Sequence, residues 1–95
     1  MDIRWIQNAR AVFVRLYGEK RGLRVCDAVL PGVTADFRRM LAAAGTYVPV
    51  RETYRTDDGR TELILEGRRT DAGPVLTRLT IGGAAVELGD KELPL

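Results

Sequence analysis

The chain has 95 residues, of which 45% are hydrophobic and 29% are charged, and its formal net charge is +2. This composition is typical of one folded globular domain, which we expect to span residues 1–95. Histidine and serine are absent, and Cys26 is the only cysteine. Ser-His-Asp or Cys-His catalysis and an internal disulfide are therefore excluded, and a zinc ion would lack ligands. We predict a protein that is not an enzyme and uses no metal or cofactor.

The sequence also predicts the compartment in which the protein works. No apolar run reaches the ~18 residues that a membrane-spanning helix needs. The first residues lack the charged and apolar regions of a secretory signal, and a single cysteine fits a reducing compartment. We therefore expect a cytoplasmic protein, either free or incorporated into a particle.

Positive and negative charges are unevenly distributed along the chain. Residues 1–39 carry eight basic and four acidic side chains, whereas residues 40–95 carry seven basic and nine acidic ones. Thirteen of the fifteen basic residues are arginines, whose guanidinium groups suit carboxylates, phosphates and aromatic faces. Opposite charge excesses in the two parts favour a head-to-tail contact between copies of the chain.

Residues 2–17 are predicted to form a helix, with a strand as the alternative. On a helix, seven apolar side chains share one continuous face: Trp5, Ile6, Ala9, Val12, Phe13, Leu16 and Tyr17. Gly18 would end this helix. The alternative rests on the stretch AVFVRLY, which is rich in the β-branched and aromatic residues that favour strands.

A strand is the next predicted element. Residues 22–30 (GLRVCDAVL) are mostly apolar and are predicted to form one strand. Pro31 and Gly32 would end this strand. Cys26 lies inside this segment, beside an aspartate and without a histidine, so we interpret it as a buried structural thiol.

A short helix is predicted over residues 34–44. Thr34 can cap its start and Gly45 can close its end. Four apolar residues follow the spacing of a buried stripe: Phe37, Met40, Leu41 and Ala44. Arg38 and Arg39 point the other way.

An Asp-Gly pair predicts the first β-hairpin. If Asp58 and Gly59 form a two-residue type I′ turn, one register follows for the flanking strands. It places three pairs on one face: Arg51 with Glu66, Arg55 with Glu62, and Thr56 with Thr61. The other face, toward the core, takes Val48, Val50, Tyr54, Leu63 and Leu65. The adjacent aspartates, and Asp71 further on, are therefore interpreted as turn residues and not as a metal or acid–base site.

A second hairpin is predicted at Gly82-Gly83, between two runs in which apolar and polar residues alternate. Residues 66–74 (EGRRTDAGP) are predicted to be the loop between the two hairpins. Residues 47–88 would then form a four-stranded antiparallel meander. The whole chain is predicted to be an α+β domain in the order α-β-α-β-β-β-β, with helices on one face of the sheet.

Arginines are the candidate binding residues, because they gather in the first quarter of the chain, on the predicted helix and in the loop between the hairpins. The set comprises Arg10, Arg15, Arg21, Arg24, Arg38, Arg39, Arg68 and Arg69. Such residues can grip carboxylates or phosphates of a partner.

Without a catalytic set, the sequence favours a structural or protein–protein interaction module. It would be a small subunit of a larger assembly, of the virion or secretion-machine kind, or a small protein that binds and regulates another. Its partner would be another protein or copies of itself. The alternative is a nucleic-acid-binding module, in which the N-terminal arginines contact the phosphate backbone.

Overall fold

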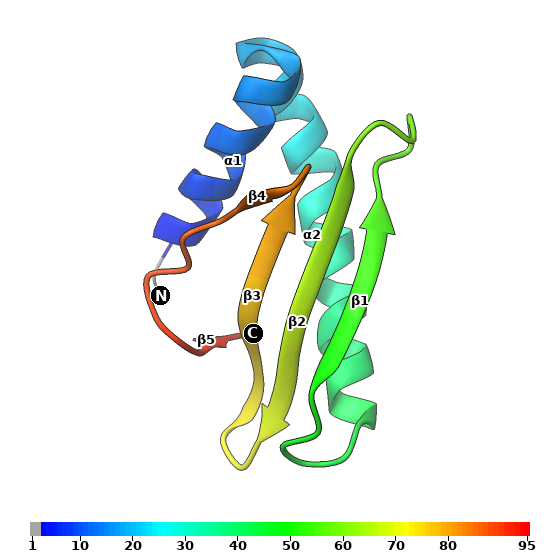
Figure 1. Ribbon diagram of the computed structural model, residues 1–95, viewed down its shortest axis with the longest axis vertical. Helices are drawn as coiled ribbons and strands as arrows, with labels where there is room; N and C mark the ends of the chain where they lie inside the picture. The colour runs from blue at the N-terminus through cyan, green and yellow to red at the C-terminus, as the bar shows by residue number, and fades with distance from the viewer. Residues whose placement is uncertain (1–2) are drawn as a thin grey trace.

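The computed structural model describes residues 3–95 and has two helices followed by a five-stranded antiparallel sheet. The elements are α1 (Arg4–Tyr17), α2 (Glu19–Ala43), β1 (Val50–Arg55), β2 (Glu62–Thr70), β3 (Gly73–Ile81), β4 (Ala84–Ala85) and β5 (Leu93–Pro94). Both helices lie on one face of the sheet, and the other face is open (Figure 1). The α+β class is confirmed, but the predicted α-β-α start is wrong, because the chain begins with two consecutive helices.

Glycines make the helical hairpin possible at its closed end. Gly18 alone joins α1 to α2, with φ of 88°, a conformation that side chains with a Cβ rarely adopt. One turn later, a Cβ on Gly22 would lie 2.6 Å from the carbonyl oxygen of Phe13. The two helices therefore touch backbone to backbone beside the turn, and they diverge toward the start of α1 (Figure 1).

The first helix confirms the prediction over the described part of residues 2–17; Asp2 lies outside the described residues. Ala9, Val12 and Phe13 are its buried residues. Leu16, predicted on the same face, is 41% exposed.

The predicted strand over residues 22–30 is wrong, because this segment is the first part of the long helix α2. The buried residues of α2 are Gly22, Cys26, Leu30, Val33, Phe37 and Leu41. Their spacing of three and four residues continues one stripe through both predicted elements. The apolar residues of GLRVCDAVL fit both the two-residue period of a strand and the 3.6-residue period of a helix. Packing against α1 favours the helix. Cys26 is buried as expected, but in a helix.

Pro31, predicted with Gly32 to end the strand over residues 22–30, lies inside helix α2 and does not interrupt it. A proline lacks the N–H that would reach the carbonyl of Asp27, four residues earlier. Both residues are on the exposed side of α2, where water can satisfy that carbonyl. Thr34, predicted to be a cap, is inside the helix, and its hydroxyl lies 2.9 Å from the Leu30 carbonyl oxygen and 3.0 Å from that of Pro31.

The first hairpin has the predicted register but a different turn. Arg51 pairs with Glu66 and Arg55 with Glu62, as expected. Gly59 is the only residue of this turn with positive φ, so the two-residue type I′ turn, which needs two, is wrong. Val48, predicted to face the core, precedes β1 and is 50% exposed.

Thr56 and Thr61 form the predicted pair, with the N–H of Thr56 donating to the Thr61 carbonyl over 3.0 Å. Both threonines are 4% exposed. They lie on the helix side with Tyr54 and not with the charged pairs, because side chains alternate along a strand.

Strand β2 is longer than predicted and absorbs most of the expected loop. It runs through Arg68 and Arg69 to Thr70, which pairs with Gly73 across a tight turn. A bulge between Glu66 and Gly67 shifts its register against β3. The predicted placement of both arginines on a loop is therefore wrong.

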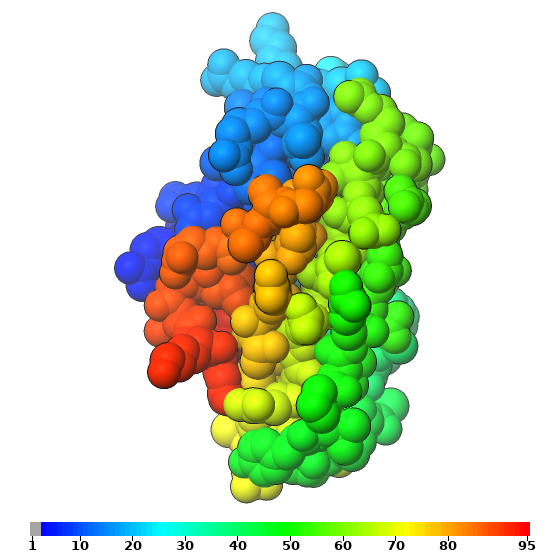
Figure 2. Space-filling model, viewed as in Figure 1, coloured from blue at the N-terminus to red at the C-terminus, as the bar shows by residue number. Residues whose placement is uncertain are grey.

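The second hairpin is confirmed. Gly82 and Gly83 both have positive φ, and Thr80 pairs with Ala85 and Ile81 with Ala84. Beyond it, the chain returns along the same edge of β3 and adds β5, where Leu93 pairs with Leu76. This last segment fills the space between the start of α1 and β3 (Figure 2).

The core lies between the helices and the sheet. Its fully buried large side chains are Phe13, Cys26, Phe37, Leu41, Leu63, Leu65, Leu76, Leu79 and Ile81. The open face of the sheet carries the charged ladder of Arg51, Glu66 and Arg78, in which the Arg78 Nε lies 3.8 Å from a Glu66 carboxylate oxygen.

Candidate functional site

Four of the eight predicted arginines are held by carboxylates of the chain itself. The ion pairs are Arg10 with Asp27, Arg21 with Asp58, Arg39 with Asp36, and Arg68 with Glu92. The members of each pair are at least about one third exposed apart from Asp58. Pairs of this kind contribute little to stability. Each pair nevertheless neutralises a positive charge that would otherwise be available to bind a phosphate backbone.

The other four arginines are distributed over three elements. Arg15 is on α1, Arg24 and Arg38 are on α2, and none of these three forms an ion pair within residues 3–95. Arg69 lies in β2, where its Nε is buried without a hydrogen-bond partner among the described residues, as is that of Arg68. The structure thus places the predicted site residues at several separate positions.

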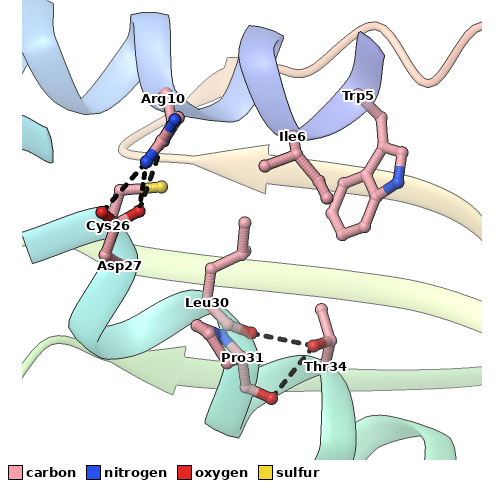
Figure 3. A pocket seen from close by; sticks show the side chains of 8 residues that line it. All are labelled: Trp5, Ile6, Arg10, Cys26, Asp27, Leu30, Pro31 and Thr34. Atoms are coloured by element: carbon pink, nitrogen blue, oxygen red, sulfur yellow. Dashed lines mark hydrogen bonds and ion pairs between the residues drawn. The ribbon is translucent and has the colours of Figure 1, made fainter. Parts of the chain in front are cut away.

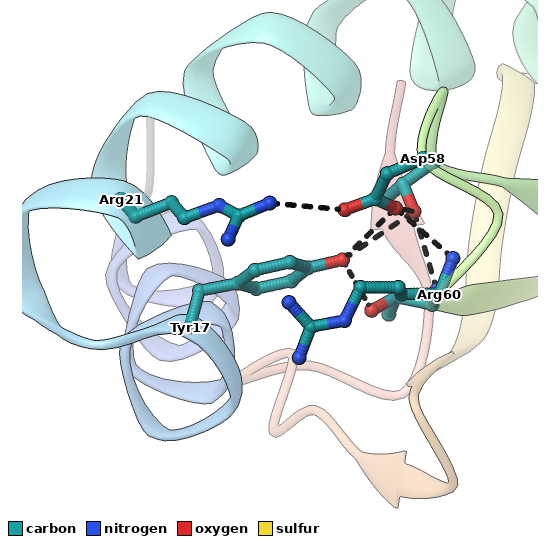
Figure 4. A network of polar contacts seen from close by, with 6 residues as sticks. Tyr17, Arg21, Asp58 and Arg60 are labelled. Carbon is teal, nitrogen blue, oxygen red and sulfur yellow. Dashed lines mark hydrogen bonds and ion pairs between the residues drawn. The ribbon is translucent and has the colours of Figure 1, made fainter.

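A polar network joins the closed end of the helical hairpin to the β1–β2 turn (Figure 4). At its centre, the Tyr17 hydroxyl lies 2.7 Å from the Thr61 hydroxyl and 3.4 Å from the Asp58 carboxylate. The guanidinium carbons of Arg21 and Arg60 lie 5.4 and 4.7 Å from the centre of the Tyr17 ring, which is the geometry of cation–π contacts.

Asp58 is the anion of this network and holds the turn together. Its carboxylate accepts hydrogen bonds from the Thr56 hydroxyl at 2.5 Å and from the backbone N–H of Arg60 at 3.0 Å. These two bonds, in that order, lower the pKa of Asp58 from its usual 3.8. Within residues 3–95, no three carboxylate or thiol side chains cluster closely enough to hold a metal ion. Asp58 lies in the turn between β1 and β2, and these two bonds hold that turn.

Replacing Tyr17 with phenylalanine should lower the free energy of unfolding by about 1–2 kcal/mol, because the buried Thr61 hydroxyl loses its partner. Urea denaturation followed by circular dichroism would measure this loss. Tyr47→Phe is the matched control, since Tyr47 is 54% exposed and its hydroxyl bond to Asp71 is long, at 3.3 Å. Equal losses in the two variants would contradict a structural role for the network.

A second polar contact ties β1 to α2. The Tyr54 hydroxyl donates to the Asp36 carboxylate over 2.8 Å, and Arg39 pairs with the same carboxylate. Burial of the ring and the bond to Asp36 raise the pKa of Tyr54. The bond from Tyr54, and then that from Arg39, lower the pKa of Asp36 from 3.8.

Acid should destabilise the fold through these two aspartates. The folded-state pKa values of Asp36 and Asp58 lie below the unfolded value of 3.8. Their contribution is therefore complete about one pH unit above 3.8, near pH 5, and is lost as the pH falls through the folded-state values. We expect the urea midpoint to fall between pH 5 and pH 2, and to fall less in the Asp36→Asn and Asp58→Asn variants. If the urea midpoint of both variants falls with pH as steeply as that of the wild type, this assignment is refuted.

An apolar groove opens on the surface where α1 and α2 diverge. Trp5 and Ile6 of α1 face Leu30, Pro31 and Thr34 of α2 across it (Figure 3). These five residues, with Leu93, Pro94 and Leu95 of the C-terminal segment, define what we call the helix groove. Its two adjoining hollows have volumes of about 470 and 710 Å³ and share Trp5, Ile6 and Thr34.

Charged side chains border both hollows. The smaller hollow is closed by the pair of Arg10 and Asp27, in which the Arg10 Nη2 lies 2.9 and 3.0 Å from the two carboxylate oxygens. The larger hollow is bordered by Arg38 of α2 and by Asp90, which precedes β5.

Cys26 lines the smaller hollow but is 1% exposed. Burial, and then the charge of Asp27, raise the pKa of its thiol to about 11. The protonated thiol is a poor nucleophile near neutral pH, so the groove can bind an apolar surface but offers no activated nucleophile.

Sequence reasoning missed the helix groove. The sequence predicts Trp5 and Ile6 on the apolar face of the first helix, and it predicts no element for residues 93–95. The signal was the Leu-Pro-Leu ending, whose apolar side chains need a surface to cover them.

Glu52, on the apolar side of β1, is half-buried.

The helices of the described chain are too short or too polar to cross a membrane. Comparisons with protein-family models, with curated proteins and with solved structures find no match.

Proposed function

We propose that this chain is a protein–protein interaction module, which serves as a small subunit of a larger assembly by docking the helix groove onto a protein surface. The helix groove is the observation that carries this proposal. Trp5 and Ile6 remain half-buried although their side chains are large and apolar. Burying such side chains against a partner is the main favourable term in most protein associations.

The charges support a protein partner over a nucleic acid. Half of the predicted binding arginines, among them Arg10 and Arg21, already pair with carboxylates. Binding to a phosphate backbone depends on free cations and the counterions that they displace. The helix groove is apolar at its centre and charged only at its rim, which is the usual composition of a protein interface.

A photo-crosslinking experiment in cells tests the proposal. The crosslinking amino acid p-benzoylphenylalanine replaces Trp5, so that an aromatic side chain still occupies the helix groove. The matched control carries it at Tyr47, an exposed aromatic residue on the loop between α2 and β1. We expect one discrete protein adduct from position 5 that is missing from position 47.

The size and nature of the adduct decide between functions. An adduct with a protein, whether a second copy or a different chain, supports the interaction module. No adduct at position 5, or the same adducts at both positions, would overturn it. A purified protein that carries nucleic acid at low salt, and loses it at high salt, would favour the nucleic-acid alternative instead.

A further inference from the structure

Two charged side chains at the rim of the helix groove have no ionic partner within the chain. Arg38 comes from α2 and Asp90 from the segment before β5, and both border the larger hollow. Both are exposed, and neither forms an ion pair among residues 3–95. They contrast with Arg10 and Asp27, which neutralise each other at the smaller hollow.

One free cation and one free anion on the same groove suit a symmetric contact. In a two-fold dimer, residue i of one copy meets residue j of the other, and j meets i. The helix groove meets this condition by itself, because Arg38 of each copy can face Asp90 of the partner subunit. A helix of a different protein would need its own acidic and basic side chains at matching positions, whereas a second copy of this chain supplies both.

Further exposed apolar surface lies at the start of α1, which supplies one wall of the groove. Ile3, immediately before α1, is 52% exposed, and Trp5 and Ile6 are half-buried. A stable interface covers about 800 Å² on each partner. That is roughly one seventh of the 5822 Å² surface of this chain, so the contact would have to extend beyond the groove walls onto neighbouring surface such as Ile3.

We propose that a second copy of this chain occupies the helix groove in a two-fold dimer, in which Arg38 pairs with Asp90 of the partner subunit at two symmetric positions. The inference rests on the proposed function, since it names the protein that the groove binds. It replaces the head-to-tail contact expected from the sequence with a reciprocal one, because the complementary charges lie on the same surface.

Charge reversal at the rim tests the reciprocal geometry. Arg38→Asp and Asp90→Arg each place like charges opposite each other twice. Sedimentation equilibrium should show a dimer dissociation constant raised about tenfold per contact, or ~100-fold in total. Both residues are exposed and unpaired, so below the dissociation constant of the wild-type dimer, where all the proteins are monomeric, the thermal midpoint of each variant should match that of the wild type.

Recombining the two changes is the decisive step. An equimolar mixture of the Arg38→Asp and Asp90→Arg proteins restores both opposite-charge contacts, so a heterodimer should form at the wild-type concentration. The double variant should likewise recover its homodimer. Thr53→Arg on the open face of the sheet is the matched control and should leave the dissociation constant unchanged.

Each alternative result would overturn the dimer. A wild-type chain that stays monomeric to the millimolar range has no such contact. If neither charge reversal changes the dimer dissociation constant, the dimer uses another surface. If each variant dimerises more weakly but the mixture of the two does not recover the wild-type affinity, reciprocal pairing is excluded. If the chain is monomeric and the photo-crosslink at position 5 captures a different protein, the interaction module stands while the second copy is rejected.

Discussion

Truncating Phe37 to alanine is expected to lower the free energy of unfolding by about 3–5 kcal/mol, the usual cost of removing a buried aromatic ring. Phe37 is 0% exposed. Its ring packs from α2 onto β2, where Cε2 would lie 3.0 Å from a Cβ placed on Gly67. The vacated space is enclosed by a helix and by the centre of the sheet, so little of it can collapse. Urea denaturation with an unchanged m-value would measure the loss.

Met40→Ala is the matched control for this prediction. Met40 belongs to the same predicted stripe but is 37% exposed, with its sulfur 3.9 Å from the Tyr54 hydroxyl. We expect it to cost less than about 1 kcal/mol, since most of its atoms leave no cavity. Comparable losses in Phe37→Ala and Met40→Ala would mean that α2 packs on a different face.

Substituting alanine for either of two glycines in α2 should have opposite effects. At Gly22, the added Cβ would lie 2.6 Å from the Phe13 carbonyl oxygen and the Val14 Cα, both backbone atoms that cannot rotate away. Separating the helices to admit it should cost about 1–3 kcal/mol. At Gly32, nothing lies within 4 Å of the added Cβ, so alanine should stabilise the helix by about 0.4–1 kcal/mol.

Thermal and urea unfolding of both variants would check these signs. Intrinsic helix propensity is the same at the two sites, and any difference reports the contact between the helices. A stabilising Gly22→Ala change would show that α1 and α2 do not approach closely at their turn.

Local sequence was sufficient for the hairpins. The register of β1 and β2 followed from the charge pairs of Arg51 and Arg55 and was correct, although Asp58 has no positive φ and the turn type was wrong. Gly82-Gly83 predicted both register and turn, because two adjacent positive-φ positions are nearly a glycine property. These contacts join residues close in sequence, so nearby side chains carry the information.

Helix α2 could not be predicted correctly from local sequence. Residues 22–30 carry apolar side chains that fit a strand and a helix equally, and Pro31 indicated a boundary. The structure favours one continuous helix because its stripe from Gly22 to Leu41 packs against both α1 and the sheet. An exposed Pro31 disturbs only the solvent side of α2.

By itself, the sequence determined the α+β class, the first helix, the hairpin registers and the lack of a histidine- or serine-based catalytic set. Tertiary structure alone decided the continuous α2, the helix groove and the positions of Arg38 and Asp90 at the rim of the same hollow. The physical reason is how far apart along the chain the contacting residues lie. Turns and strand pairs depend on neighbours along the chain, whereas the groove joins Trp5 to Leu95, and only the packed fold brings those residues to one surface.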